Sequence, residues 1–389
     1  MQPHAETETP RSSPPAFTWI SAGDTYRAMV GMLAQAGRLA VDIEADSLYH
    51  YFEKVCLIQI STDTRTYVID PLVVRSLSEL GRLMADPEIE KVFHAAGYDL
   101  LSLKRDYGFT FRNIFDTHVA AQFLGHEQLG LSALLEGFLG VRHSKHRQRD
   151  DWSRRPLDPD QLRYAAMDTH YLLPLRDLLE QELREKGRLD WAREEFESML
   201  DAEPHEKSFD AEGYRRIKGS RDLSPQQLAV LRALYLLRDH YARALDLPPF
   251  KVLGNSVLID LARNPPLHAD QLARRPGISA RVATRFSGEI LRAIRKARVE
   301  DTLEFHPQGH PVWRSHSQEA QSRLERLKAW RQAKAEELKL HVGVVFPGSL
   351  LEALAASPPP DDASLAGMDG MRAWRAREFG PEILRILRP

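Results

Sequence analysis

Short apolar runs alternate with amphipathic stretches along the first half of the chain. The segments LAVDIEA (39–45), CLIQIS (56–61) and TYVID (66–70) are rich in Val and Ile, which predicts three successive strands. KVFHA (91–95) and IFD (114–116) predict two further strands, each followed by a helical stretch. Three hairpin-like strands followed by alternating strands and helices are typical of an α/β domain built on a mixed sheet.

Polar residues at helix-start positions mark where two of the predicted helices begin. Ser76 and Glu79 have the spacing of a capping box, which predicts a helix over about 77–86. In DPDQ (158–161), Asp stands at the N-cap, Pro in the first turn and Gln three residues after the Asp, which predicts a long helix. The other helices predicted in this half run over about 99–107 and up to about Leu124.

The second half of the chain contains an internal repeat and no convincing strand pattern. A shift of 93 residues without a gap aligns FSGEILRAIR (286–295) with FGPEILRILR (379–388). The same shift aligns apolar residues at helical spacing, together with Gly and Pro, over a wider region. Two copies of one small helical fold retain such a pattern. We therefore predict two small all-α domains, with residues 301–318 as the linker between them.

The composition is ordinary for a globular protein, with 43% hydrophobic and 28% charged residues over a length of 389, enough for two or three domains. The single cysteine, Cys56, excludes an internal disulfide and a zinc site made of several thiolates. No uncharged apolar run approaches the ~18–20 residues of a membrane span, and the N-terminus lacks the features of a secretory signal. We therefore expect no membrane partner and a cytoplasmic location. The sequence has no P-loop, GxGxxG or nucleophile-elbow motif, which argues against an ATPase, a dinucleotide enzyme and a serine hydrolase.

The formal net charge of −2 conceals an uneven distribution along the chain. Residues 1–210 carry a net charge of −11, residues 211–300 carry +9 and residues 301–389 are neutral. Acidic surface disfavours nucleic acid unless divalent cations bridge the two, whereas a basic module attracts phosphate backbones. Taken alone, these values are equally compatible with domains that simply differ in charge.

Two acidic side chains stand at the end of the first predicted strand. Asp42 and Glu44 are separated by one residue, and the alternation of a strand points both to the same face. Carboxylates this close at the end of a buried strand repel one another unless a cation lies between them. In isolation, the same pattern also fits an exposed strand end.

Two further acidic positions fall on predicted helices. Tyr164 and Asp168 are four residues apart and share a face of the long helix, where the small Ala165 and Ala166 allow close packing. Asp99 follows a predicted strand and lies near the start of a helix, where the helix dipole favours a negative charge. A core tyrosine beside a solvated aspartate, and a charge at a helix start, account for these positions when each is taken alone.

The four acids, in this order along the chain, resemble the three exonuclease motifs of the DEDD superfamily. The resemblance is to the tyrosine-bearing DEDDy branch, because Tyr164 precedes Asp168 by four residues and Arg163 stands where the other branch has a histidine. The chain is also similar to the ribonuclease D family over roughly residues 20–200, and the repeat resembles two helicase-and-RNase-D C-terminal (HRDC) domains. The segments that carry the ribonuclease D resemblance are CLIQIS, YVIDPL, KVFHA, FDTHVAAQFLG, DDWSRRPL and RYAAMDTHYLLPL.

This resemblance implies an α/β ribonuclease H-like exonuclease domain with a mixed β-sheet, followed by two small all-α HRDC domains. The N-terminal tail of about 16 residues lies outside the part of the chain that resembles the family. The second HRDC copy lacks the net positive charge of the first. The division that we expect is a disordered tail over 1–16, a DEDDy 3′–5′ exonuclease domain over 17–205, HRDC domain 1 over 215–300, a linker over 301–318 and HRDC domain 2 over 319–389.

Four carboxylates suit hard divalent cations, and we expect two divalent metal ions, Mg²⁺ or Mn²⁺, rather than zinc. The resemblance implies that Asp42 bridges both ions, with Glu44 and Asp168 on the ion that carries the attacking water. Asp99 is implied to support the second ion. Tyr164 is implied to orient the water by a hydrogen bond, because an ordinary tyrosine, with a pKa near ~10, is a poor general base. We expect all five residues to be catalytic.

The implied activity is that of a metal-dependent 3′–5′ exoribonuclease, which trims structured RNAs such as tRNA precursors and releases nucleoside 5′-monophosphates. Lys145 and Arg149, in a basic run before the Tyr164 helix, are candidates for holding substrate phosphates, and a solvated loop accounts for them equally well. One alternative is a DNA exonuclease with the same site, because the contacts to the 2′-OH that would separate the two are not visible in the sequence. Another is a catalytically silent RNA-binding scaffold, which would not need four converging carboxylates. We expect RNA as the partner and a monomer.

Overall fold

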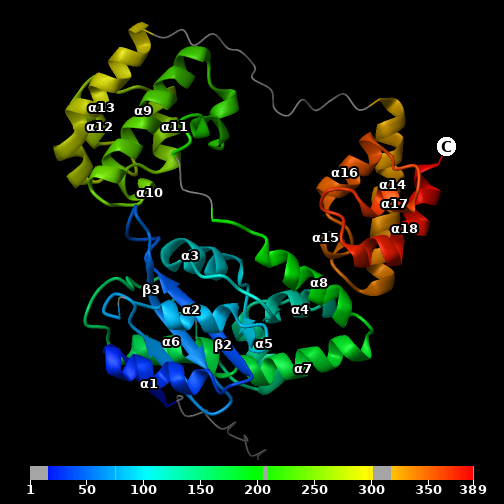
Figure 1. The fold of residues 1–389 in the computed structure, drawn as a ribbon. Coiled ribbons are helices and arrows are strands. Elements are labelled where there is room, and N and C mark those ends of the chain that lie inside the picture. The colour runs from blue at the N-terminus through cyan, green and yellow to red at the C-terminus, as the bar shows by residue number, and fades with distance from the viewer. Residues whose placement is uncertain (1–15, 75, 145, 205–208, 301–316, 389) are drawn as a thin grey trace, which may run out of the picture. The chain divides into compact units, whose positions relative to one another are not determined.

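A six-stranded sheet forms the centre of the first half of the chain in the computed structural model (Figure 1). The structure describes residues 16–74, 76–144, 146–204, 209–300 and 317–388. The strand order is β1-β4-β3-β2-β5-β6, in which β2, β3 and β4 pair antiparallel and the remaining neighbours pair parallel. The mixed sheet predicted from the sequence is therefore confirmed. The strands are β1 (Phe17–Ile20), β2 (Arg38–Ala45), β3 (Val55–Ser61), β4 (Thr66–Ile69), β5 (Glu90–Phe93) and β6 (Ile114–Asp116).

The pairing of β2 with β3 determines which side chains share a face of the sheet. All of β3 is buried, which explains its almost uninterrupted apolar sequence VCLIQIS. Asp42 lies opposite Gln59, and Glu44 lies opposite Leu57. Residues that are opposite in an antiparallel pair point to the same face, so one face carries Asp42, Glu44 and Gln59.

Eight described helices accompany the sheet, and their ends follow local polar chemistry. Asp158 is the N-cap of α6, as predicted, and forms a capping box with Gln161. The backbone N–H of Gln161 donates to the Asp158 side chain at 2.8 Å, and the backbone N–H of Asp158 donates to the Gln161 side chain at 3.0 Å. The third helix ends at Gly108, whose φ of +66° disfavours a residue with a side chain. The helices are α1 (Gly23–Leu33), α2 (Ser78–Ala85), α3 (Gly97–Tyr107), α4 (Thr117–Leu124), α5 (Leu131–Leu139), α6 (Pro159–His170), α7 (Leu172–Glu185) and α8 (Leu189–Leu200).

The sequence prediction fails at the start of α2 and before residue 38. Helix α2 begins at Ser78, and its N-cap residue is Leu77, with no hydrogen bond from a side chain to the helix start. The predicted capping box of Ser76 and Glu79 is therefore wrong. The sequence pattern predicts neither β1 nor α1. Strand β1 has four residues, of which only Ile20 is buried, and gives no continuous apolar run, while α1 buries only Tyr26, Met29 and Leu33.

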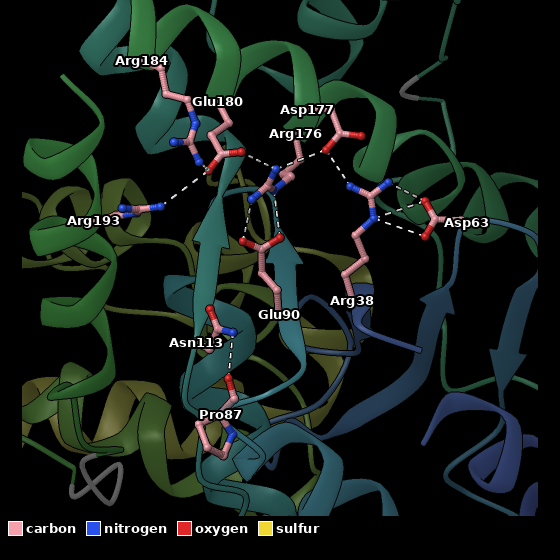
Figure 2. A network of polar contacts seen from close by, with 10 residues as sticks. All are labelled: Arg38, Asp63, Pro87, Glu90, Asn113, Arg176, Asp177, Glu180, Arg184 and Arg193. Carbon is pink, nitrogen blue, oxygen red and sulfur yellow. Dashed lines mark hydrogen bonds and ion pairs between the residues drawn. The ribbon is translucent and has the colours of Figure 1, made fainter. Parts of the chain in front are cut away.

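A network of ion pairs joins α7 to the ends of β2 and β5 that lie away from Asp42 and Glu44 (Figure 2). Arg176 on α7 donates to Glu90 at 2.8 Å and to Glu180 at 2.6 Å. Arg38, at the start of β2, donates to Asp177 on α7 at 2.5 Å. Because several partly buried charges share partners, the network fixes α7 against the sheet better than isolated surface pairs would.

Residues 46–54 and 205–312 form a second compact unit, described here within 46–54 and 209–300. Its core contains Leu231, Leu258 and Ile290. Asp246 fixes the 46–54 segment by accepting hydrogen bonds from the backbone N–H groups of residues 51 and 52, both at 3.0 Å. The elements are η1 (Gly213–Arg216), η2 (Ser220–Asp222), α9 (Pro225–Ala244), α10 (Pro249–Val252), α11 (Asn255–Arg263), α12 (Ala269–Ala273) and α13 (Ala280–Glu300).

The last five helices repeat the previous five at the offset seen in the sequence. Helices α10 and α15 span 249–252 and 342–345, and α11 and α16 span 255–263 and 348–356, each 93 residues apart. The predicted helical repeat is therefore confirmed. The predicted tail and linker, apart from residues 16, 317 and 318, lie outside the described residues. The second set is α14 (Gln318–Leu338), α15 (Val342–Val345), α16 (Gly348–Ala356), α17 (Asp362–Ala366) and α18 (Ala373–Leu387).

The second helical set belongs to the same compact unit as the sheet. Trp374 of α18 is fully buried and stacks on Trp191 of α8, with ring centroids 4.7 Å apart. Arg375 donates to Glu195 of α8 at 2.7 Å. An apolar stack beside a buried ion pair accounts for the joint core of these two parts. Across the described ranges, no helix has the length and apolar character that crossing a membrane requires.

Candidate active site

Three of the predicted acids converge on one face of the sheet. The carboxylate oxygens of Asp42, Glu44 and Asp168 lie within 4.8 Å of one another. The first two come from β2, and Asp168 comes from α6, which packs across β2, β3 and β4. Close packing of α6 is possible because Ala165 and Ala166 are small and fully buried, and because Thr169 shares a hydrogen bond with Ser61 of β3 at 2.7 Å.

Asp99 approaches the same site from the first turn of α3. Its side chain is buried, and its charge is felt by both Asp42 and Glu44, although it is not part of the three-residue group. The turn that leads into α3 depends on Asp116 of β6, whose carboxylate accepts from the backbone N–H of Ala96 at 2.7 Å. Asp116 thus holds the turn that presents Asp99.

All four acids have a pKa raised above the ordinary value, and burial is the main cause for each. For Asp42, the charges of Asp99, Asp168 and Glu44 raise the pKa further. For Asp168, a hydrogen bond from His143 partly opposes the rise in pKa. Asp99 and Asp168 are buried and Asp42 and Glu44 are half-buried. Carboxylates crowded in this way are stabilised in their charged form by a cation.

Tyr164 lies one helical turn before Asp168 and is buried. Burial raises the pKa of its phenol well above the ordinary value, and the neighbouring Asp168 raises this pKa further. The hydroxyl therefore keeps its proton at neutral pH and serves as a hydrogen-bond donor rather than as a base.

His143 is a close neighbour of the site that the sequence analysis does not identify. Its Nε2 lies 2.7 Å from Oδ1 of Asp168, and its ring stacks on that of Tyr164 with centroids 5.1 Å apart. In the sequence it stands inside a basic run and resembles its neighbours, so only the fold distinguishes it. Gln59 and Asp116 are likewise found only through the structure.

The structure describes only part of the surroundings of the basic run, residues 142–149. Lys145 lies outside the described residues. Arg147 is paired with Asp150 at 3.0 Å and with Asp158 at 3.4 Å, so its charge is partly neutralised within the chain. For Lys145 and Arg149, contact with substrate phosphate stays a prediction.

The donor set fits hard divalent cations. Carboxylate oxygens are the ligands that Mg²⁺ and Mn²⁺ prefer, and the neighbouring acids add to the rise in the pKa of Asp42 and Glu44 that burial causes. Gln59, opposite Asp42, is fully buried, and neither Nε2 nor Oε1 of its amide has a hydrogen-bond partner in the described parts of the chain. An ion with its bound water would supply the polar partner that this amide lacks.

Comparisons with known proteins agree with this geometry. A family model described as 3′–5′ exonuclease matches residues 17–184, and one described as HRDC domain matches 227–294 and 320–387. A protein named Ribonuclease D from Sphingobium indicum is 30% identical over 372 residues, which cover 95% of this chain and 94% of that relative.

The chain belongs to the ribonuclease D family. It is a 3′–5′ exoribonuclease with an α/β exonuclease domain and HRDC domains, as the sequence resemblance implies. The acidic cluster agrees with the divalent-metal dependence that is typical of this exonuclease family.

Solved structures of related proteins have the same fold as this chain. The catalytic core of RRP6 from Trypanosoma brucei is 31% identical, with a TM-score of 0.67, over 75% of this chain and 83% of that one. Escherichia coli RNase D has the same fold, with a TM-score of 0.69 and 24% identity over 96% of this chain and 99% of that one. The predicted fold class is therefore confirmed.

Proposed function

We propose that this exoribonuclease trims the 3′ ends of structured RNAs such as tRNA precursors and releases nucleoside 5′-monophosphates by two-metal-ion hydrolysis. The observation that supports the chemistry is the convergence of the carboxylate oxygens of Asp42, Glu44 and Asp168 within 4.8 Å. Burial raises the pKa of each of these acids, so the site favours cations over other ligands.

Each of the five predicted residues has a role in this proposal. Asp42, Glu44 and Asp168 would hold one Mg²⁺ or Mn²⁺, and Asp42 together with Asp99 would hold the second. When bound, two such ions stabilise the attacking and leaving oxygens of an in-line displacement at phosphorus. Tyr164 retains its phenolic proton, because burial raises its pKa, and it orients the attacking water. Lys145 and Arg149 would hold substrate phosphates beside the site.

The first HRDC domain would hold the body of the RNA through α13. Its cationic face, which we define as Arg281, Arg285, Arg292, Arg295 and Lys296, is exposed, and the spacing of these residues places them on one side of the helix. Such a face attracts the phosphate backbone. In the second copy, buried Trp374 stands at the position of Arg281 and Glu378 at that of Arg285.

We also propose the domain division given by the sequence analysis, with the exonuclease domain over 17–205 and the HRDC domains over 215–300 and 319–389. The matched ranges of the family models fall within these limits. A monomer would suffice for catalysis, because all five residues of the site come from one chain. A cytoplasmic location suits an enzyme that acts on RNA.

The test is a time course on a 5′-labelled tRNA that carries a short 3′ tail, with Mg²⁺, Mn²⁺ or EDTA in parallel lanes. A matched single-stranded DNA reports the choice of nucleic acid. Asp42→Asn is the site variant, and Asp63→Asn is the control, because Asp63 is an exposed acid in the network away from the site. Thin-layer chromatography of the released product identifies the nucleotide.

We expect a ladder that shortens from the 3′ end of the RNA, with nucleoside 5′-monophosphate as the product. The ladder should disappear with EDTA and with Asp42→Asn, and persist with Asp63→Asn. Cleavage of the DNA alone would retain the chemistry and overturn the substrate. Full activity of Asp42→Asn would overturn the assignment of the site.

A further inference from the structure

His143 is held next to the proposed site by contacts on its backbone and side chain. Its carbonyl accepts a hydrogen bond from Oγ of Ser132 on α5 at 2.6 Å. Its side chain is only 6% exposed. The backbone of His143 is thus anchored to α5, and its imidazole is enclosed by neighbouring side chains.

The imidazole of His143 contacts two groups of α6 at once. Nε2 lies 2.7 Å from Oδ1 of Asp168, and the ring is stacked on Tyr164 at an interplanar angle of 30°. These two residues are four positions apart and share a face of α6. One side chain from the segment after α5 therefore touches both residues that α6 contributes to the site.

The hydrogen bond between His143 and Asp168 orients the carboxylate that is proposed to bind a metal ion. A carboxylate has two oxygens, so a donor at Oδ1 fixes the plane of the group and leaves Oδ2 for an ion. Hydrogen bonds of this kind to ligating groups orient them and raise metal affinity. The stacking contact acts on Tyr164 in a similar way, because it restricts the ring whose hydroxyl is proposed to orient the water.

We propose that His143 is a positioning residue of this exonuclease site, which orients Asp168 for the divalent ion and holds the ring of Tyr164. The inference rests on the proposed function for the roles of Asp168 and Tyr164. It assigns His143 no contact with the substrate and no proton transfer.

His146 provides a matched control from the same segment. Its ring lies 6.3 Å from that of Tyr164, and its Nδ1 is hydrogen-bonded to Ser144 at 2.8 Å rather than to an acid of the site. Replacement of His146 by Ala therefore removes an imidazole of equal size without removing a contact to Asp168.

Three variants separate the two contacts of His143. His143→Gln keeps a donor close to the position of Nε2 and loses the stacked ring. His143→Phe keeps the ring and loses the donor, and His143→Ala loses both. The readouts are the binding of Mn²⁺ to the full chain without RNA, measured by titration calorimetry, the kcat and KM on a short 3′-tailed RNA, and the thermal unfolding temperature in EDTA.

We expect His143→Ala to weaken Mn²⁺ binding by about 10- to 100-fold, the range that loss of a hydrogen bond to a ligand produces. Its kcat should fall by at least about tenfold with KM little changed, because the residue does not touch the RNA. Gln should restore Mn²⁺ affinity to within about threefold of the wild type, whereas Phe should not. His146→Ala should match the wild type in Mn²⁺ affinity, because it removes no contact to Asp168.

Mn²⁺ affinity in His143→Ala equal to that of the wild type would overturn the proposal, and so would a Gln variant no better than Ala. Absence of Mn²⁺ binding in the wild type would also overturn it. Failure of the proposed function would give a different result, in which the wild type binds Mn²⁺ but releases no nucleotide from RNA. In that case the order of Mn²⁺ affinities among the variants would still decide the role of His143.

Discussion

Asp42 and Gln59 face each other across β2 and β3, and the amide of Gln59 has no hydrogen-bond partner in the described structure. A buried amide without a partner costs free energy of folding, of the order of 1–3 kcal/mol. Its position beside a carboxylate that is proposed to bind a metal ion offers a reason for the cost. Removal of this amide should therefore raise the free energy of unfolding and weaken the binding of a metal ion.

We expect Gln59→Met, which keeps the shape of the side chain, to raise the free energy of unfolding in EDTA by about 1 kcal/mol, since no buried amide is left unpaired. The same variant should bind Mn²⁺ more weakly than the wild type. Urea unfolding and titration calorimetry measure the two effects. Gln59→Glu is the companion variant and should destabilise the metal-free protein, because it adds a carboxyl to a cluster of acids.

Destabilisation of Gln59→Met by more than about 1 kcal/mol would mean that the amide is satisfied in the folded protein, by water or by a change in side-chain position. Equal Mn²⁺ affinity in Gln59→Met and the wild type would separate Gln59 from the metal site.

The acids of the site predict how the metal-free enzyme responds to pH. Burial raises the pKa of Asp42, Glu44, Asp99 and Asp168 in the folded state above the values in the unfolded chain. A raised pKa means that the folded protein binds protons more tightly, so this stabilisation is present at low pH and is lost as pH rises through the folded-state pKa values.

In EDTA, the unfolding temperature should therefore rise as pH falls from about 8 to about 5. Added Mn²⁺ should raise the unfolding temperature most at the upper end of this range, because the ion binds the charged carboxylates. Asp42→Asn should flatten the pH dependence in EDTA, and Asp63→Asn should not. Differential scanning calorimetry measures each case, and a wild-type profile that is flat in EDTA would contradict the raised pKa values.

The sequence was sufficient for the elements that bear strong local signals. The buried strand β3 has an almost continuous apolar run and was predicted close to its observed limits, and the start of α6 was predicted from DPDQ. The motif spacing also led to Asp42 and Asp168, which lie far apart in the chain and converge only through the packing of α6 on β2 and β3.

Residues whose role depends on a tertiary contact were not predictable in this way. His143 stands in a basic run, and nothing in its neighbours indicates a hydrogen bond to Asp168. Ser76 and Glu79 show the opposite case, in which a local capping-box pattern is present but the helix begins one residue later than it predicts, at Ser78. The observed N-cap, Leu77, has no side-chain oxygen that could accept a capping hydrogen bond, and the helix is held to the core by buried Leu80, Leu83 and Met84.

We expect the side chain of Asp116 to contribute more to the free energy of unfolding than an ordinary helix cap does. Its buried carboxylate caps α4 by accepting from the backbone N–H groups of His118 and Val119 at 2.8 and 3.0 Å. It also accepts from Ala96, in the turn that leads to Asp99. Asp116→Ala should lower the free energy of unfolding by about 3 kcal/mol, because several buried donors lose their acceptor, and should lower kcat as Asp99 loses its support.

Asp158→Ala is the control for this prediction, since Asp158 caps α6 at an exposed position, and its loss should cost only about 1 kcal/mol. Chemical unfolding in EDTA compares the two variants. Equal costs would show that the contact of Asp116 with the turn before α3 adds nothing to its role as a cap.

Gly125 tests the packing of the second HRDC copy against the exonuclease domain. Its φ is +86°, and an added Cβ would lie 2.1 Å from the carbonyl oxygen of Lys339, in the loop after α14. Gly125→Ala should therefore loosen residues 317–388 from the domain that carries α8. Limited proteolysis should release a C-terminal fragment faster than from the wild type, and the unfolding temperature should fall.

Gly140→Ala is the matched control, because Gly140 also has a positive φ, +66°, at a helix end, but an added Cβ meets nothing within 4 Å. It should cost about 1 kcal/mol through backbone strain alone and leave the proteolysis pattern unchanged. The same fragment released at the same rate from both variants would contradict a role for the Gly125 contact.

The two HRDC copies allow a comparison at one position of the repeat. Arg292 on α13 and Arg385 on α18 are both exposed and are related by the 93-residue offset. Arg292 belongs to the cationic face that we propose to bind RNA, whereas α18 has buried Trp374 and Glu378 at equivalent positions of its own face. Reversal of charge at Arg292 should therefore weaken binding of long structured RNA, and reversal at Arg385 should not.

The measurement is the dissociation constant for a 3′-tailed tRNA over a range of salt concentrations. Arg292→Glu should lower the slope of log K against log salt by about one, since one phosphate contact is lost, and Arg385→Glu should leave the slope unchanged. Turnover of a short single-stranded RNA should be the same in both variants, because such a substrate does not require the cationic face. Equal losses at the two positions would indicate a general effect of charge and would remove the basis for assigning RNA binding to the first copy alone.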